Sequence, residues 1–455
     1  MHDHDENDGR PVYLVGIGGI GMSALARYFK ATGHPVAGYD KTPSPLTLKM
    51  SEEEGIAITH ADDAAGIGEA FRDRSRALVV YTPAVPAENR ILSYFRENGH
   101  ALHKRAEVLG LISRDKRALC VAGTHGKTTI TTMTAFLLHE SRVGCTAFLG
   151  GISSNFGTNL LVDAASPFVV IEADEFDRSF LHLHPEASVI TSMDADHLDI
   201  YGTRERLVEA FEQFACQTGG PLFARAGLTL QRREVTGHYA AGEPADYRAD
   251  RLRVEDGYFH FDYAAPGVSI PGLRLAFPGR VNVENAVAAI TLALHAGATP
   301  AEIREALPRF KGVARRFDVH ARGRVIYIDD YAHHPREIEA TLASVREMWP
   351  ARRLTVAFQP HLYSRTLDFY PGFAKSLGLA DEVILLDVYP AREKPLPGVT
   401  SRLIADRLTV PHALAGREEF PALVRAKVTD GVFMTVGAGD IDRFVPVFTA
   451  MFNEK

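Results

Sequence analysis

The chain has 455 residues, of which 46% are hydrophobic and 24% are charged, and its formal net charge is −7. This length exceeds one ordinary domain, and the composition is that of a folded globular protein, which excludes a disordered or fibrous chain. No basic stripe is evident, so we expect no nucleic-acid partner. The three cysteines, Cys120, Cys145 and Cys216, form no CxxC pair, which favours a reducing cytoplasm over a disulfide framework or a zinc site.

Residues 1–10 are polar and acidic and do not resemble a secretory signal. No apolar run approaches the roughly 18–20 residues needed to span a bilayer, so we expect no membrane insertion. Neither feature fixes the oligomeric state, and both a monomer and a homodimer remain open.

Short β-branched runs alternate with helical patterns over most of the chain, which predicts an α/β protein built from βαβ units. In the first part, strands are expected at 11–17, 35–39 and 77–81, with a helix at 22–32. This arrangement is typical of a Rossmann-like nucleotide-binding domain.

A second set of elements begins with a strand at 117–122 and a long helix after Lys127, and continues with strands near 167–171 and 187–191. These strands predict a parallel sheet of the P-loop ATPase type. Between 219 and 279 the periodicity becomes short and strand-like, with Gly and Pro punctuation, which indicates a small antiparallel insertion in the same domain.

A third set of strands is expected at 325–328, 353–358, 382–387 and 432–436, after a basic segment at 311–317. These strands also alternate with helical patterns, so a second Rossmann-like domain is predicted at the C-terminal end. The three predicted domains are residues 1–106, 107–315 and 316–455.

The first glycine motif is GIGGIGMS at 16–23, between a predicted strand and a predicted helix. Glycines in this setting let backbone amides approach a pyrophosphate, and Asp40, at the end of the next strand, is placed to hold a ribose hydroxyl. The motif does not distinguish NAD from a UDP-sugar, and it also fits a tight turn that binds neither. The candidate contacts are Gly18, Gly19, Ile20, Gly21, Met22, Ser23 and Asp40.

The second glycine motif is GTHGKTT at 123–129, also between a strand and a helix. Its bare amides, lysine and hydroxyl groups are suited to the β- and γ-phosphates of a nucleoside triphosphate and to a magnesium ion. Val121 stands where the first glycine of the standard P-loop would be, so this loop is a shorter variant. The candidate phosphate contacts are Gly123, Thr124, His125, Gly126, Lys127, Thr128 and Thr129.

Two acidic clusters, EADE at 172–175 and DADH at 194–197, follow predicted strands. The carboxyl ends of parallel strands form ligand crevices, and oxygen ligands with one imidazole suit Mg²⁺ or Mn²⁺. Thr128, Glu172 and His197 are the candidate metal ligands. A single histidine is more often structural, and the other carboxylates also fit solvated loops or helix caps.

GTHGKTT, EADE and DADHLDIYG, in this order and spacing, resemble the central ATPase domain of the Mur ligase family. GIGGIGMS, DDYAHHP at 329–335, FQPHLYSRT at 358–366 and VGAGDID at 436–442 look like its L-alanine-adding branch. The resemblance covers nearly the whole chain. It implies that ATP drives the joining of L-alanine to the lactyl carboxylate of UDP-N-acetylmuramate, and that successive domains hold the UDP group, ATP and the amino acid.

The resemblance also implies roles for individual residues. Lys127 would contact the γ-phosphate, while Glu172 and His197 would hold metal ions near the reacting carboxylate and make up the catalytic set with Lys127. His125 would face both the ATP and the UDP-sugar. Asn285 would lie near the adenine, and the implied alanine contacts are Tyr331, His333 and Arg365.

The sequence departs from the family pattern at three places. Val281 stands where the family often has a histidine, which puts the adenine-side contacts in doubt. Leu362 replaces a common arginine, which leaves Arg365 as the clearer partner for the alanine carboxylate. Residues 199–219 contain no lysine, whereas some sister ligases carry a carbamylated lysine in that segment, and this difference favours the alanine-adding branch.

Several alternatives remain open from the sequence. Taken alone, DDYAHHP also fits an ordinary loop before a helix with Pro335 in its first turn. The nearest functional alternative is a recycling ligase that attaches a tripeptide to the same nucleotide sugar. An NAD-dependent dehydrogenase that uses the first glycine loop and a non-catalytic nucleotide-binding switch are the others.

Overall fold

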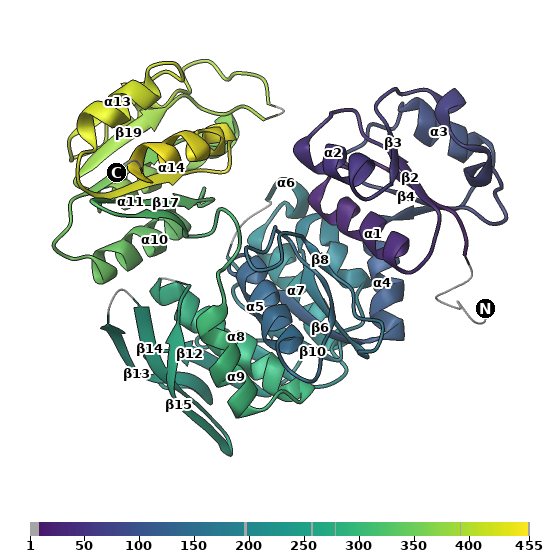
Figure 1. Cartoon of the computed structure of the whole chain (residues 1–455), viewed down its shortest axis with the longest axis horizontal. Helices are drawn as coiled ribbons and strands as arrows, with labels where there is room; N and C mark the ends of the chain where they lie inside the picture. Colours follow the sequence, from purple (N-terminus) through teal and green to yellow (C-terminus); the bar gives the residue numbers. More distant parts are fainter. Residues whose placement is uncertain (1–8, 195–197, 256–257, 278, 392, 454–455) are drawn as a thin grey trace. The chain divides into compact units, whose positions relative to one another are not determined.

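The computed structural model describes residues 9–194, 198–255, 258–277, 279–391 and 393–453, and it confirms the α/β class (Figure 1). The chain divides into two compact units. The first unit comprises Met1–Ala240, Pro244–Tyr247 and Ala288–Ala306, and the second comprises Ala241–Glu243, Arg248–Val287 and Leu307–Lys455.

The N-terminal sheet of the first unit has the strand order β3-β2-β1-β4-β5, and each neighbouring pair is parallel. The central strand is buried throughout because helices cover both faces of such a sheet, which explains its unbroken apolar sequence. The strands are β1 (Val12–Val15), β2 (Val36–Tyr39), β3 (Ala57–Thr59), β4 (Leu78–Tyr81) and β5 (Leu102–Lys104). Its helices are α1 (Ile20–Ala31), α2 (Pro45–Glu52), α3 (Arg90–Glu97) and α4 (Arg105–Asp115).

The central sheet of the first unit has the order β8-β7-β9-β6-β10-β11-β12. Its strands are β6 (Arg117–Ala122), β7 (Thr146–Phe148), β8 (Leu160–Leu161), β9 (Phe168–Ala173), β10 (Ala187–Ile190), β11 (Leu222–Arg225) and β12 (Gly237–Ala241). The strands from β7 to β12 are parallel, and β8 is an antiparallel edge. The order places the ends of β6, β9 and β10 side by side.

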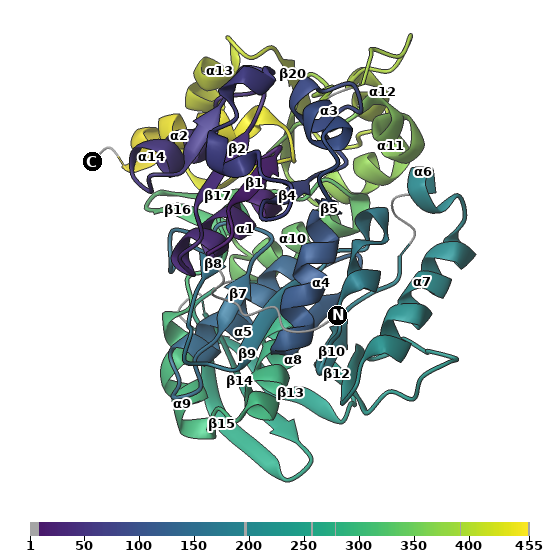
Figure 2. The same cartoon turned by 90° about the vertical axis from the view of Figure 1, so that its right-hand side faces the viewer.

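Helices cover both faces of the central sheet. Helix α5 (Lys127–His139) contacts β6 and β9. Helices α4 and α7 (Arg204–Gln217) pack in one hydrophobic core with every second residue of the same two strands. Figures 1 and 2 show α5 and α4 on opposite sides of these strands. The remaining elements of this unit include η3 (Phe176–His182), α6 (Leu198–Tyr201), the end of α8 (Arg280–Ala296) and α9 (Pro300–Ala306).

The antiparallel insertion is shorter than the sequence predicted. It consists of β13 (Tyr247–Glu255), β14 (Tyr258–Ala265) and β15 (Val268–Leu275), which pair antiparallel in sequence order. The strands β11 and β12, which lie within the predicted insertion, extend the parallel sheet instead. The periodicity did not distinguish them because short parallel and antiparallel strands have the same side-chain alternation.

The C-terminal sheet of the second unit has the order β16-β17-β21-β18-β19-β20 and is parallel except for the edge pair β16–β17. Its strands are β16 (Asp318–Arg322), β17 (Val325–Asp330), β18 (Leu354–Phe358), β19 (Glu382–Leu386), β20 (His412–Ala415) and β21 (Gly431–Val436). Its helices are α10 (Pro335–Met348), α11 (Tyr363–Leu377), α12 (Arg402–Ala405), α13 (Phe420–Lys427) and α14 (Val445–Asn453).

The predicted strands of the three sets are all present, and the predicted strand at 117–122 coincides with β6. The first helix begins at Ile20, two residues before the prediction. Within the described part of the chain, no helix combines the length and the apolar character that crossing a membrane requires.

Candidate active site

The first glycine turn joins β1 to α1. Gly16 adopts a left-handed conformation (φ 89°), and a Cβ at this position would lie 2.5 Å from the Thr82 side chain, so the turn requires glycine. The amide of Gly18 donates a 2.7 Å hydrogen bond to Oδ2 of Asp40. Helix α1 has no side-chain cap at its N-terminus. Asp40 therefore fixes the turn, and the bare end of α1 suits an anion.

A cavity of about 810 Å³ opens at this turn. Its lining includes five of the predicted contacts, namely Gly19, Ile20, Gly21, Met22 and Asp40. Gly18, Ser23 and His125 are not among the described residues that line it. Ser23 is fully buried, and its hydroxyl contacts the Ile20 carbonyl and the Asn159 side chain, which gives this residue a structural role.

The cavity also contains polar residues that sequence reasoning missed, among them Lys41, His60, Asn89 and Arg105. Arg105 begins α4, and its guanidinium lies against α1, since a Cβ at Gly21 would be 2.6 Å from Nη1. It is suited to offset the charge of a diphosphate at the end of α1. No local motif marks Arg105, because its role arises from the packing of α4 beside α1.

The cavity extends from the first glycine turn to the end of β9, where Glu172 and Asp174 line it. Glu172 also contacts the second glycine turn, because its Oε1 accepts a 3.2 Å hydrogen bond from the hydroxyl of Thr128. The cavity therefore reaches from the predicted diphosphate contacts to a carboxylate that contacts the first turn of α5.

The phosphate loop joins β6 to α5. Gly123 (φ 132°) and Gly126 (φ 81°) both have left-handed backbone, and Gly126 begins α5 without a side-chain cap. A Cβ at Gly123 would lie 2.0 Å from the Thr191 hydroxyl and 2.8 Å from the Ser192 amide. The loop thus packs closely on the segment that follows β10, and the amides in the first turn of α5 have no side-chain cap, an arrangement that suits an anion.

Lys127 lies under this loop, where its Nζ donates hydrogen bonds to the Gly123 carbonyl at 2.7 Å and to Oε2 of Glu175 at 2.6 Å. Burial acts to lower the pKa of Lys127, but the carboxylates of Glu175, Asp174 and Glu172 outweigh it and raise that pKa. The lysine is therefore fully charged at neutral pH, as a phosphate partner must be.

The remaining loop side chains are also anchored to the end of β10. The hydroxyl of Thr124 donates to the Asp194 carbonyl, and Nε2 of His125 lies 3.3 Å from Oδ2 of Asp194. Thr129 is buried in the first turn of α5. The amides of Thr124 and His125 donate to the carbonyl and the hydroxyl of Ser192, so the amides left for an anion are those at the start of α5.

The donors present fit a hard divalent cation. Thr128 supplies a hydroxyl beside the Glu172 carboxylate, and such oxygen ligands suit Mg²⁺. His197, the third predicted ligand, lies outside the described residues. No group of three or more His, Cys, Asp or Glu side chains within the described ranges forms a metal site by itself. A metal held here would also need ligands from His197 or from the bound phosphates.

Asn285 lies in the part of α8 that belongs to the second unit. It is buried, and its side-chain amide donates a 3.0 Å hydrogen bond to Oδ1 of Asn282. Val281, at the position of the first departure, is exposed on the same helix. The adenine contact of Asn285 stays a prediction.

Two of the predicted alanine contacts, Tyr331 and His333, follow β17 in the second unit, and the third, Arg365, lies in α11. The ring centres of Tyr331 and His333 are 5.3 Å apart, and Nδ1 of His333 donates a 3.0 Å hydrogen bond to the Tyr331 carbonyl. Burial lowers the pKa of His333, and the positive charge of Arg365 lowers it further, against the opposing effect of Glu337. His333 thus links the three predicted residues, because it contacts Tyr331 and its pKa responds to the charge of Arg365.

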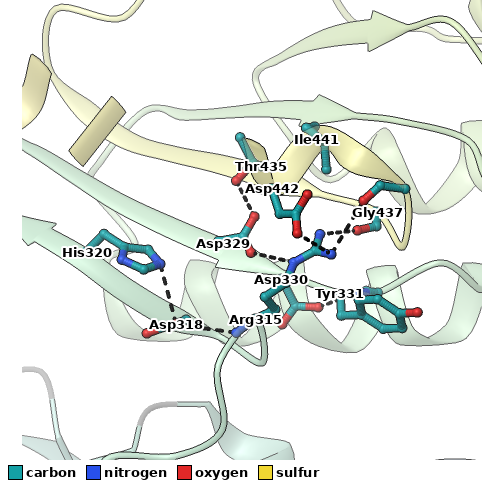
Figure 3. Close-up of polar contacts among 12 residues, drawn as sticks. Arg315, Asp318, His320, Asp329, Asp330, Tyr331, Thr435, Gly437, Ile441 and Asp442 are labelled. Atoms are coloured by element: carbon teal, nitrogen blue, oxygen red, sulfur yellow. Dashed lines mark hydrogen bonds and ion pairs between the residues drawn. The ribbon is translucent and has the colours of Figure 1, made fainter. Parts of the chain in front are cut away.

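Arg315, which sequence reasoning missed, holds this region together (Figure 3). Its guanidinium contacts Oδ2 of Asp329 at 3.1 Å, the Gly437 carbonyl at 2.6 Å and Oδ2 of Asp442 at 3.4 Å. Its carbonyl accepts a 2.6 Å hydrogen bond from the Tyr331 amide, and its guanidinium carbon lies 5.1 Å from the Tyr331 ring centre. Arg315 therefore links the ends of β17 and β21 and supports the Tyr331 ring.

The fold and these sites define an α/β protein with two glycine turns, each at the start of an uncapped helix, and a cavity that opens at the first of them. The Mur ligase family catalytic domain matches residues 11–117, the Mur ligase middle domain matches residues 121–293, and the Mur ligase glutamate ligase domain matches residues 315–439. The chain belongs to the Mur ligase family.

Individual relatives are consistent with this assignment. The UDP-N-acetylmuramate–L-alanine ligase of Phocaeicola vulgatus is 50% identical over 99% of this chain and 100% of its own length. The enzyme of the same name from Porphyromonas gingivalis is 50% identical over 95% of this chain and 97% of its own.

Solved structures show the same fold. The UDP-N-acetylmuramate-alanine ligase MurC of Thermotoga maritima has a TM-score of 0.82 and 30% identity, covering 97% of this chain and 99% of that chain. A murein peptide ligase of Psychrobacter arcticus has a TM-score of 0.66 and 21% identity, with coverages of 98% and 100%. The family assignment does not favour the dehydrogenase alternative.

Proposed function

We propose that this protein is an ADP-forming ligase that joins L-alanine to the lactyl carboxylate of UDP-N-acetylmuramate at the expense of ATP. The observation that carries the proposal is the continuous space between the first glycine turn and the end of β9 beside the phosphate loop. This arrangement suits a nucleotide sugar whose acid group must reach a nucleoside triphosphate. The relatives of the same name support the identity of both substrates.

In the first step of the proposed reaction, an oxygen of the lactyl carboxylate attacks the γ-phosphorus of ATP, the bond to the bridging oxygen breaks, and ADP leaves. The product is an acyl phosphate. The charged Lys127 and the amides at the start of α5 offset the negative charge of the phosphates during this transfer. Because two anions must meet, positioning and neutralisation supply most of the rate acceleration.

In the second step, the neutral amine of alanine attacks the acyl carbon, and inorganic phosphate departs to leave an amide. Arg365 is proposed to pair with the alanine carboxylate, and Tyr331 and His333 to line its pocket. His333 is held neutral by the lowered pKa, so it adds no charge that would repel an ammonium group entering the site. The amine loses one proton in this step, and the departing inorganic phosphate can carry it away as hydrogen phosphate.

Thr128 and Glu172, with His197, are the proposed holders of Mg²⁺ or Mn²⁺. Such an ion, when bound, shields the phosphate oxygens and favours approach of the carboxylate. The adenine contact of Asn285, the ribose contact of Asp40, the UDP-sugar contacts and the domain bounds at 106 and 315 belong to the same proposal. So do a cytoplasmic location, the absence of a nucleic-acid partner, and a monomeric or homodimeric state.

The proposal is tested by phosphate release from ATP with UDP-N-acetylmuramate and a panel of amino acids, with the murein tripeptide as a separate arm. We expect turnover to require the sugar nucleotide and to be fastest with L-alanine. Preference for the tripeptide would identify the recycling ligase instead. Slow ATP hydrolysis that ignores both other substrates would identify a nucleotide-binding switch.

A further inference from the structure

The lysine of the phosphate loop is already engaged by the protein itself. Glu175, which follows β9, accepts a 2.6 Å hydrogen bond from Nζ of Lys127. The Lys127 side chain is 12% exposed and that of Glu175 only 1%. Without a nucleotide, the ammonium group that is expected to meet the γ-phosphate is thus paired with a buried carboxylate.

The pair is not symmetrical. Lys127 has a second acceptor in the Gly123 carbonyl, 2.7 Å away, which belongs to its own loop. Glu175 uses only Oε2, while its Oε1 is buried and has no hydrogen-bond partner among the described residues. A carboxylate with one unsatisfied oxygen in a buried site holds its partner less firmly than a bidentate one. The contact is therefore suited to exchange.

The backbone holds Glu175 in place independently of Lys127. The Glu175 carbonyl accepts a 2.6 Å hydrogen bond from the buried Tyr201 hydroxyl. Asp177 and Arg178, two and three residues further on, have left-handed backbone (φ 51° and 56°), and Lys104 contacts Asp177 at 3.3 Å. The backbone that carries the Glu175 side chain is therefore anchored by contacts other than its pair with Lys127.

We propose that Glu175 is a stand-in for the terminal phosphate of ATP, which holds Lys127 charged and in position in the empty loop and gives it up when the triphosphate binds. This inference rests on the proposed binding of ATP at residues 123–129. In this inference, Glu175 and the γ-phosphate compete for the ammonium group of Lys127. The competition lowers ATP affinity and stabilises the nucleotide-free protein.

The test uses Glu175→Gln, which keeps the shape of the side chain and removes its charge. ATP and ADP affinities are measured with magnesium by calorimetry, without sugar nucleotide or alanine, and melting temperatures are measured with and without nucleotide. We expect ATP affinity to rise by about five- to tenfold, in the usual range of a coupling between competing contacts. ADP affinity should change much less because ADP has no γ-phosphate, and the nucleotide-free melting temperature should fall.

Two controls separate this result from simpler effects. Glu382→Gln removes another buried carboxylate, which pairs with Lys427 and Arg353 in the second unit, and should lower stability without changing ATP affinity. Glu175→Asp keeps the charge but shortens the reach to Lys127. It should shift ATP affinity in the same direction by a smaller factor, and it serves if the glutamine variant folds poorly.

Unchanged or weaker ATP binding in both Glu175 variants would overturn the inference and indicate a structural or metal-binding role. An equal gain for ATP and ADP would also overturn it, because it would reflect only a lower negative charge near the site. If the wild-type protein binds ATP but fails to use alanine, the proposed substrates are wrong while the stand-in role is still decided by the same measurements.

Discussion

Three strand-to-helix turns, two in the first unit and one in the second, differ in how their helices begin. In the first unit, α1 and α5 start at glycines and have no side-chain cap. In the second unit, α10 starts at His334 with a capping box, in which Glu337 accepts from the backbone amides of His333 and His334. Uncapped amides are available to phosphate groups, whereas a capped turn leaves recognition to its side chains.

A few residues at the start of the helix therefore decide which kind of ligand group a βα turn can bind. The two uncapped turns also differ from each other in the source of their positive charge. Lys127 supplies it within the second glycine turn, whereas Arg105 supplies it to the first glycine turn from another helix. The capped turn instead presents Tyr331 and His333.

Lys127→Ala should have the largest effect, because it removes the only charged side chain within residues 123–129 that can neutralise a phosphate. We expect phosphate release to fall by about 10³-fold, in line with the loss of one preorganised donor to a developing charge. Lys49→Ala, on an exposed face of α2, is the control and should leave the rate unchanged. Retention of more than about a tenth of the activity would contradict the assignment.

Gly123→Ala tests whether the second glycine turn needs glycine because of close packing. The added Cβ would collide with Thr191 and Ser192, so we expect a loss of about 2–4 kcal/mol in the free energy of unfolding, together with weak ATP binding. Gly157→Ala is a matched control, because that glycine also has positive φ (65°) but has no atom within 4 Å of its Cβ position. Its cost should be about 1 kcal/mol. The free energy of unfolding is measured with urea for both variants. Equal losses would show that backbone strain at positive φ, and not close packing, explains the glycine at position 123.

Arg105→Ala tests whether the first turn depends on a charge from outside the motif. The KM for UDP-N-acetylmuramate should rise by about tenfold, a typical loss for one charge-assisted contact, while the KM for ATP stays unchanged. Arg76→Ala, an exposed arginine in the same domain, is the control. A parallel rise in both KM values would mean that Arg105 supports the fold and not a ligand.

His333→Asn tests the capped turn and should have the smallest effect. The pKa of His333 is lowered in the folded protein, so protonation favours the unfolded chain, and stability is lost as the pH falls below the ordinary value of 6.5. Wild-type stability should therefore drop more between pH 7.5 and 5.5 than that of the variant. The free energy of unfolding is measured with urea at both pH values. An identical drop in the two proteins would show that the pKa of His333 is not lowered by its surroundings.

The sequence was informative where one residue type decides the local structure. Gly16 and Gly123 could be predicted because their turns require glycine, and strand β6 because its buried run is uninterrupted. The short edge strands β3 and β5 were missed because their residues are half-exposed and show no clear alternation. Edge strands are fixed mainly by their neighbours.

The parts of the site that the sequence did not reveal depend on long-range packing. Glu175 was recognised only as one of several acidic residues, and its contact with Lys127 needs the pairing of β6 with β9. The left-handed backbone of Arg315 and Leu362 has no signal in residue type. Tertiary contacts impose these conformations, and the same contacts place the residues beside the predicted sites.

The central claim is that residues 123–129 hold the triphosphate with Lys127 on its terminal phosphate. It is tested most directly by a crystal structure with magnesium and a non-hydrolysable ATP analogue. We expect the phosphates to lie against the first turn of α5, with Nζ of Lys127 moved from Glu175 to a γ-phosphate oxygen. A triphosphate bound elsewhere would contradict the account.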